Sequence, residues 1–149
     1  MSKFNGGRTP VTVIVRLAQE HIDAMVTHAL EDAPVECCGL LGGTGTTVAS
    51  VHKAANAEES PYRFSIDFRE QRRIEEELNE AGHAIQGFYH SHTGSEARPS
   101  PTDIRMMEVF FAPPYIHFVI GTSEPDTPVV RVFHIEAGTY TEHEYEIVE

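Results

Sequence analysis

The stretch AIQGFYHSHTGSEARPSPTD, residues 84–103, joins an apolar, aromatic run to a polar loop and a helix start. The run from Ala84 to His92 is apolar enough for a central β-strand. Ser100, Pro101 and Asp103 then supply an N-cap, a proline at the first helical position and an acid in the first turn. The stretch therefore predicts a buried strand, a loop and a helix that begins after Ser100.

The remaining elements follow from periodicity on both sides of this stretch. Apolar residues that alternate along the chain predict strands, and apolar residues at helical spacing predict helices. We expect strands at residues 11–17, 38–41, 46–51, 62–66, 115–121, 129–135 and 141–148, and helices at 18–32 and 67–82. About seven strands with three helices indicate an α/β fold, in which one mixed sheet is flanked by helices.

Two local sequence signals mark where these elements turn or begin. Gly42, Gly43 and Gly45 predict a glycine-rich turn that joins two strands into a hairpin. Asp67 and Glu70, three residues apart, predict a capping box at the start of the second helix.

The chain of 149 residues has room for one domain, which we expect at residues 11–149, after a flexible N-terminus at residues 1–10.

The charge balance limits the classes of partner. Acidic residues outnumber basic ones 23 to 11, which gives a formal net charge of −12. Such a charge repels phosphate backbones and anionic lipid surfaces, so nucleic acid and membranes are not expected partners. It favours a partner with a basic or neutral docking face, although it also serves solubility alone. The oligomeric state stays open, a homodimer included.

The cysteines and the N-terminus point to a reducing compartment. Cys37 and Cys38 are the only two cysteines, and neighbouring cysteines cannot staple distant segments. The first ten residues lack the apolar stretch of a signal peptide, and no window of the chain is long and apolar enough for a membrane span. We therefore expect a cytoplasmic protein without a disulfide framework.

A candidate metal site lies in the quoted stretch. His90 and His92 are two apart on a predicted strand, so both imidazoles face one side. Asp103, in the first turn of the next helix, is the third ligand candidate. Two imidazoles and one carboxylate leave the fourth tetrahedral position for water, which is typical of catalytic zinc. The other seven histidines are expected to be surface or core residues.

Two other metal chemistries do not match the pattern. Mononuclear iron oxygenases also use two histidines and a carboxylate, but their usual order is the reverse of this one. Zinc nucleobase deaminases need a Pro-Cys-x-x-Cys segment, which is absent from the sequence.

The joint pattern resembles the motif of the JAMM, or MPN+, metallopeptidases. That motif is an upstream Glu followed by His-x-His, seven residues, and Ser-x-x-Asp. Glu36 matches the upstream acid, within Glu36-Cys37-Cys38-Gly39-Leu40-Leu41. The likeness extends to the segment from Asn56 to Asp67 and covers most of the chain from Val11 onward.

The resemblance implies roles for five residues and a fold. His90, His92 and Asp103 would bind one zinc ion, Glu36 would be the general acid and base, and Ser100 would donate to the oxyanion of the tetrahedral intermediate. The family fold is a cytidine-deaminase-like α/β sandwich, consistent with the order of elements above.

Within the family, the sequence is most similar to bacterial peptidases of ubiquitin-like sulfur carrier proteins, particularly those that free cysteine from the carrier's C-terminal glycine. The resemblance thus implies a zinc peptidase of cysteine and sulfur metabolism with such a carrier as its substrate. Two alternatives remain: a deubiquitinase-like isopeptidase that cleaves at lysine, and a non-catalytic MPN scaffold.

Two further residues carry open interpretations. Cys38 lies near the proposed base, but a small buried core residue is the favoured interpretation, because a metal-dependent hydrolase needs no thiol nucleophile. Arg98 lies in the loop between His92 and Ser100. It could meet a carboxylate of the substrate, although a solvated loop arginine is the simpler interpretation.

Overall fold

The computed structural model describes residues 13–110 and 116–149, and only the backbone of residues 107–110. The elements in these ranges are β1 (Ile14–Ala18), α1 (Gln19–Asp32), β2 (Cys38–Thr44), β3 (Thr47–Ala54), α2 (Phe68–Glu80), β4 (Ala84–His92), α3 (Pro101–Phe110), β5 (Ile116–Gly121), β6 (Val129–Glu136) and β7 (Thr139–Val148). The predicted flexible N-terminus at residues 1–10, the first two residues of the predicted strand 11–17 and the first residue of the predicted strand 115–121 lie outside the described residues.

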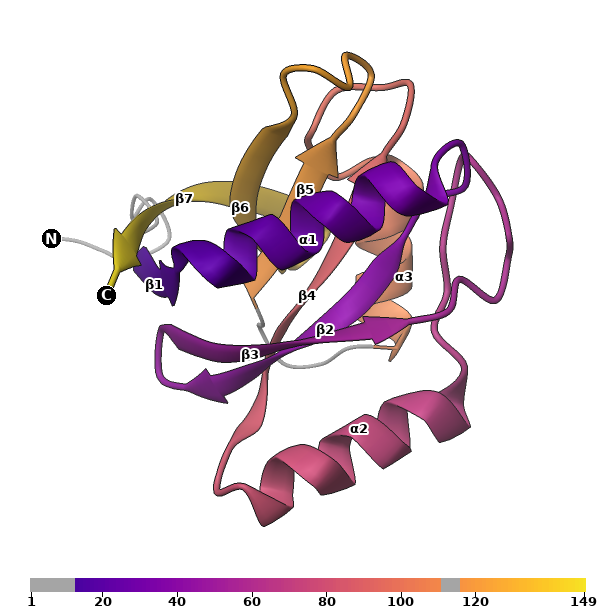
Figure 1. Cartoon of the computed structure of the whole chain (residues 1–149). Coiled ribbons are helices and arrows are strands. Elements are labelled where there is room, and N and C mark those ends of the chain that lie inside the picture. The colour runs from indigo at the N-terminus through magenta and orange to yellow at the C-terminus, as the bar shows by residue number, and fades with distance from the viewer. Residues whose placement is uncertain (1–12, 111–115) are drawn as a thin grey trace, which may run out of the picture.

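All of these strands belong to one curled, mixed sheet (Figure 1). The strand order is β1-β3-β2-β4-β5-β6-β7, and β1 also pairs with β7, so that the sheet closes into a barrel. The pairs β1–β3, β1–β7 and β4–β5 are parallel, and the others are antiparallel. The predicted mixed sheet with three helices is confirmed, and its closure is a further finding.

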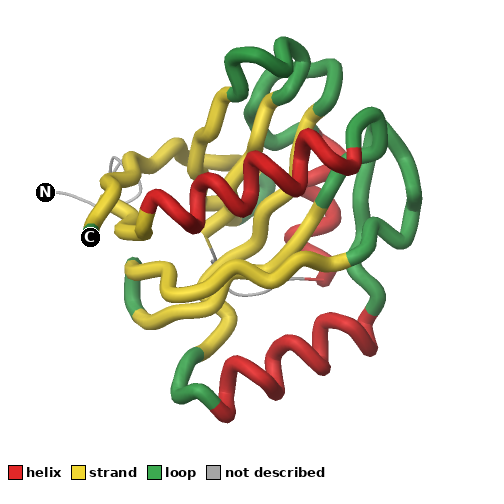
Figure 2. The backbone as a smooth tube through the Cα atoms, viewed as in Figure 1, coloured by secondary structure: helices red, strands yellow, loops and turns green. Residues whose placement is uncertain are grey.

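Helices cover the sheet on two sides (Figures 1 and 2). The helix α1 crosses in front of β4 and β5, and its residues Ile22, Met25 and Ala29 pack into a core with Leu17 and Phe118. The helix α2 runs beneath the β2–β3 hairpin, and its residues join a second core with Phe64, Phe88 and Cys38. Strand β4 is thus buried between helices, as its apolar sequence predicts.

The β2–β3 hairpin forms as predicted, but its turn is shorter than the sequence indicated. Only Gly45 lies in the turn, with a φ of 58°. Gly42 and Gly43 belong to β2, where the register shifts between them. A Cβ at Gly42 would clash with the side chain of Leu78 on α2, so this glycine allows α2 to approach the sheet closely.

The prediction of a strand at residues 62–66 was wrong. This segment is a loop, and its backbone hydrogen-bonds chiefly to the side chain of Asn56 instead of to a neighbouring strand. Asn56 donates through Nδ2 to the carbonyl of Arg63 at 3.0 Å, and its Oδ1 accepts from the backbone N–H of Ser65 at 3.2 Å. Alternation predicted a strand because Phe64 is buried, but burial here comes from packing beneath the sheet.

Only half of the predicted capping box forms at the start of α2. Asp67 accepts from the backbone N–H of Arg69 and Glu70, as an N-cap does. The carboxylate of Glu70 does not return to Asp67 and instead accepts from the backbone N–H of Ala55 at 3.0 Å. This bond ties α2 to the end of β3.

The helices of the described residues include none with the length and apolar character that a membrane crossing requires.

Candidate metal centre

His90 and His92 lie at the end of β4 and direct their side chains to one point. Their Nε2 atoms are 3.0 Å apart, and both rings are buried. The residue between them, Ser91, faces the other way and accepts from the backbone N–H of Cys37 at 2.8 Å. The alternation of a β-strand therefore produces the pair, as the sequence predicted.

Asp103 joins this pair from the first turn of α3. Its Oδ2 lies 3.0 Å from Nε2 of His90 and 3.0 Å from Nε2 of His92. Oδ2 also accepts from the backbone N–H of Ser100 at 2.9 Å, and the Oγ of Ser100 accepts from the N–H of Asp103 at 3.0 Å. This reciprocal cap holds the carboxylate at the histidines, so Asp103 both caps the helix and completes the cluster.

The chemistry of the three donors fits a cation. The Nδ1 of His92 lies 2.6 Å from the carbonyl oxygen of Glu96, which can only accept, so Nδ1 carries the proton. In the neutral ring, Nε2 then presents a bare lone pair to the carboxylate oxygen of Asp103. Two lone pairs at that distance are stable only with a proton or a metal ion between them.

The spacing also suits a metal ion of zinc's size. The three donor atoms all lie within 4.8 Å of one another. Zinc holds nitrogen and oxygen ligands at about 2.0–2.2 Å, so two of its tetrahedral ligands lie roughly 3.3 Å apart. In the part of the chain that the structure describes, no other three side chains of this kind are grouped in this way. These three side chains could therefore bind a metal ion.

Burial and the carboxylate set the protonation of the cluster. Burial lowers the pKa of His90 and outweighs the opposing charge of Asp103. Burial also acts to lower the pKa of His92, but its bonds to Asp103 and to the Glu96 carbonyl outweigh it and raise that pKa. Burial acts to raise the pKa of Asp103, but the two histidines hold it far below its usual range. Asp103 is thus an ionised carboxylate, as a metal ligand must be.

Glu36 reaches this cluster from the segment that links α1 to β2. Its backbone N–H donates to the carbonyl of Ser60 at 2.9 Å, and its carbonyl accepts from Asn56 at 3.0 Å. The next residue, Cys37, is bonded to Ser91 between the two histidines. Backbone bonds on both sides therefore fix where the Glu36 side chain begins.

The carboxyl group of Glu36 is buried without a local partner. The residue is 2% exposed, and its Oε1 has no hydrogen-bond partner among the described residues. Burial raises its pKa to about 8; the nearby Asp103 adds to this rise, whereas His92 opposes it. A buried acid with a raised pKa beside three candidate metal ligands is a candidate for proton transfer.

Ser100 has a hydroxyl proton to spare. Its Oγ accepts from Asp103, as described above, so the hydroxyl hydrogen is left to donate. Ser100 and His92 also line one pocket of about 580 Å³, together with Ser95, Glu96, Arg98, Pro99, Pro101, Ile104 and Tyr140. The loop between His92 and Ser100 therefore borders this pocket.

Arg98 and Cys38 have different surroundings. Arg98 lines the pocket, is 55% exposed in its side chain, and pairs through Nε with Glu96 at 3.1 Å. Cys38 is buried in the core beneath the sheet, and burial raises the pKa of its thiol far above the usual range. The structure therefore agrees with the interpretation of Cys38 as a packing residue.

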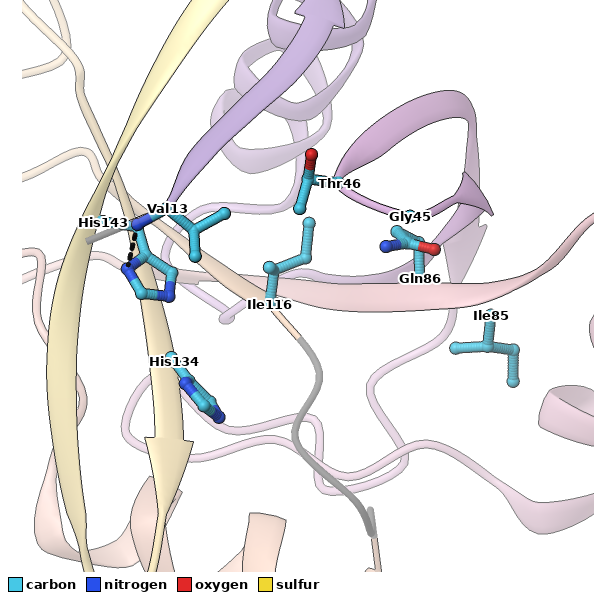
Figure 3. A pocket seen from close by; sticks show the side chains of 8 residues that line it. All are labelled: Val13, Gly45, Thr46, Ile85, Gln86, Ile116, His134 and His143. Carbon is cyan, nitrogen blue, oxygen red and sulfur yellow. Dashed lines mark hydrogen bonds between the residues drawn. The ribbon is translucent and has the colours of Figure 1, made fainter. Parts of the chain in front are cut away.

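Other histidines lie apart from the cluster, with one exception. His134 and His143 line a second pocket of about 360 Å³, with Gln86 near the opposite end of β4 (Figure 3). His143 there accepts from the backbone N–H of Val13 at 3.3 Å. The exception is His117 on β5, whose Nε2 lies 2.7 Å from Nδ1 of His90. The sequence indicated only a surface or core residue at this position and no contact with His90, although the apolar strand around it could have marked it as buried.

Residues 18–135 match the family of prokaryotic homologs of the JAB domain. This chain belongs to that family. The predicted membership of the JAMM/MPN+ family is therefore confirmed.

Two relatives of this JAB-family chain match it over different lengths. It is 32% identical over 145 residues to the CysO-cysteine peptidase of Mycobacterium tuberculosis, which covers 95% of this chain and 97% of the relative. It is 37% identical over 94 residues to a desampylase of Haloferax volcanii, which covers 58% of this chain and 68% of the relative.

Solved structures support the same fold. A Desulfitobacterium hafniense protein superposes with a TM-score of 0.81 at 34% identity, over 91% of this chain and 94% of that one. A JAB1/MPN domain protein from Archaeoglobus fulgidus superposes with a TM-score of 0.58 at 16% identity, over 89% of this chain and 98% of that one. The predicted JAB/MPN fold is confirmed.

Proposed function

We propose that this chain is a zinc peptidase that hydrolyses the bond after the C-terminal glycine of a ubiquitin-like sulfur carrier protein. One observation carries the proposal: His90, His92 and Asp103 converge on a single point, beside the buried acid Glu36. Zinc would be held by these three ligands, in a ratio of one ion per chain. The family membership and the names of its relatives support the same class of reaction.

Hydrolysis of an amide requires a nucleophile, a stabilised oxyanion and a proton for the departing amine. Zinc, when bound, would act as a Lewis acid on the scissile carbonyl and would make water more acidic. Glu36 would take a proton from the attacking water and pass it to the leaving nitrogen. The hydroxyl of Ser100 would donate to the oxyanion, because its own acceptor role is already filled by Asp103.

The substrate proposal follows the relative that matches along almost its whole length. That relative is named a CysO-cysteine peptidase, so we propose that this chain releases cysteine from a carrier, in cysteine biosynthesis. The unpaired, buried thiols of Cys37 and Cys38 favour a reducing compartment such as the cytoplasm.

A second candidate is an isopeptidase that removes a ubiquitin-like protein from lysine, which the shorter match to the desampylase favours. The two candidates use the same site and differ in the leaving group. A free cysteine leaves with its own α-carboxylate, whereas the amine of a lysine within a protein has no free carboxylate beside it.

Mass spectrometry of two carrier adducts tests the proposal. The zinc-loaded protein is incubated with a carrier bearing cysteine on its terminal glycine, and with the same carrier joined to lysine of a protein. We expect loss of cysteine from the first adduct, and no loss after zinc is removed by a chelator. Cleavage of the lysine adduct alone would establish the second candidate. Stoichiometric zinc without cleavage of either adduct would indicate a non-catalytic scaffold.

Arg98 is expected to contribute to the choice of leaving group. It lines the pocket beside His92 and Ser100, and only its Nε is engaged, with Glu96, among the contacts that the described residues show. A carboxylate on the leaving cysteine could pair with the rest of the guanidinium. Replacing Arg98 with Ala should raise KM for the cysteine adduct about tenfold, the effect of roughly 1.4 kcal/mol, with little change in kcat.

Steady-state kinetics on the cysteine adduct measures this effect. The matched control is Arg105→Ala, since Arg105 is an exposed arginine on α3 that bonds to Thr102 and does not line the pocket. An unchanged KM in Arg98→Ala, or an equal rise in both variants, would contradict a role of Arg98 in binding the carboxylate.

A further inference from the structure

His117 lies outside the predicted ligand set but contacts one member of it. It is located on β5, which runs parallel to β4, and it points to the same face of the sheet as His90. Its Nε2 is 2.7 Å from Nδ1 of His90, and the ring planes meet at 72°. Both residues are 0% exposed, so water does not compete for this bond.

The surroundings of His117 are otherwise apolar. Its ring lies 6.0 Å from that of Phe64 and 6.3 Å from that of Phe88. Its Nδ1 is buried without a hydrogen-bond partner among the described residues. An apolar side chain would fill this space without burying an unpaired polar atom. A histidine that served packing alone is therefore disfavoured here, and its one described hydrogen bond, to His90, identifies its task.

The direction of that hydrogen bond is set by the metal site. When Nε2 of His90 binds a metal ion, its lone pair is used there, so the ring proton is on Nδ1. Nδ1–H then donates to Nε2 of His117, whose own proton is on the unpartnered Nδ1. His92 has the equivalent support from the carbonyl of Glu96. The Nδ1 atoms of His90 and His92 thus each have one hydrogen-bond acceptor, on the side of the ring away from the proposed metal.

We propose that His117 is a positioning residue for the metal ligand His90. It accepts the Nδ1–H of His90 and directs the Nε2 lone pair of that ring at the metal. Because His117 accepts as a neutral ring and not as a carboxylate, it orients the ligand without adding negative charge behind the metal. The inference rests on the proposed metal site and deepens it.

Zinc affinity, measured by competition with a chromophoric chelator, tests this role without using enzyme activity. His117→Phe keeps an aromatic ring between Phe64 and Phe88 but removes the acceptor, and should weaken zinc binding about 10- to 100-fold. His117→Leu removes the acceptor in a second way, should the larger ring not fit. His117→Gln restores a neutral acceptor and should recover most of the loss.

The matched control is His28→Leu. His28 is also buried and hydrogen-bonded through its ring, to the hydroxyl of Tyr89 at 2.7 Å, but it lies on α1, on the other side of β4. Its loss should leave zinc affinity unchanged. Equal zinc affinity in wild type and His117→Phe would overturn the inference. An equal loss of zinc affinity in His117→Phe and His28→Leu would overturn it too. A wild type that binds no zinc would instead refute the proposed metal site.

A second readout uses the wild type itself. In the zinc-loaded protein, NMR of ¹⁵N-labelled imidazoles should show a slowly exchanging proton on Nδ1 of His90 that is hydrogen-bonded to His117. A proton on Nε2 of His117 would overturn the inference, because that atom could then not accept.

Discussion

Replacement of Glu36 by Gln is expected to reduce turnover of the cysteine adduct by about 10²- to 10⁴-fold, the usual contribution of a general base. The amide has nearly the same shape as the carboxyl group but cannot take a proton from water. Zinc should remain bound at one ion per chain, because the proposed donor set consists of His90, His92 and Asp103. The loss should therefore appear in kcat and not in zinc content.

Steady-state kinetics and metal analysis of one sample measure both quantities. The matched control is Glu58→Gln in the loop after β3, where the acid is paired with Arg63 at 3.1 Å and is partly exposed. That variant should keep wild-type turnover. Full activity in Glu36→Gln would remove Glu36 from the mechanism, and loss of zinc from it would make Glu36 a ligand.

The same substitution is expected to stabilise the metal-free fold at neutral pH. Burial raises the pKa of Glu36 from 4.5 to about 8. Between these values the unfolded chain is ionised at this position while the folded chain keeps its proton, so the free energy of unfolding falls as the pH rises. Gln does not ionise in either state. At pH 7 the variant should therefore be more stable than wild type by about 3 kcal/mol.

Urea unfolding of both metal-free proteins between pH 4 and pH 8 measures this difference. Below pH 4.5 the two free energies should converge, since Glu36 is then protonated in both states of the wild type. A difference that does not depend on pH would show that Glu36 ionises in the folded protein as readily as in the unfolded chain. The burial of Glu36 would then cost no stability at neutral pH. We expect instead that the fold loses stability by burying this acid at the proposed site.

The sequence predicted the grouping of His90, His92 and Asp103 well because these residues are close along the chain. His90 and His92 are related by the repeat of a strand, and Asp103 by the cap of the helix that follows. Both relationships depend on local backbone geometry, which short patterns report directly. The same local signals placed α1 and the start of α3 correctly.

Segments that depend on distant partners were predicted less well. Residues 62–66 look like a strand, yet the side chain of Asn56 binds their backbone and Phe64 stacks on His90 with ring centroids 4.5 Å apart. Gly42 looks like a turn residue, yet it lies in a strand that packs closely against Leu78. In both cases contacts from elsewhere in the fold override the local preference.

The sequence by itself determined the family, the order of strands and helices apart from the wrongly predicted strand at residues 62–66, and the three side chains that converge on one point. The tertiary structure alone decided that the sheet closes through β1 and β7, that Oε1 of Glu36 is buried without a hydrogen-bond partner among the described residues, and that His117 lies within hydrogen-bond distance of His90. The physical reason is the range of the interactions. Backbone periodicity and caps act within a few residues, whereas strand pairing and desolvation depend on segments that meet only after the chain has folded.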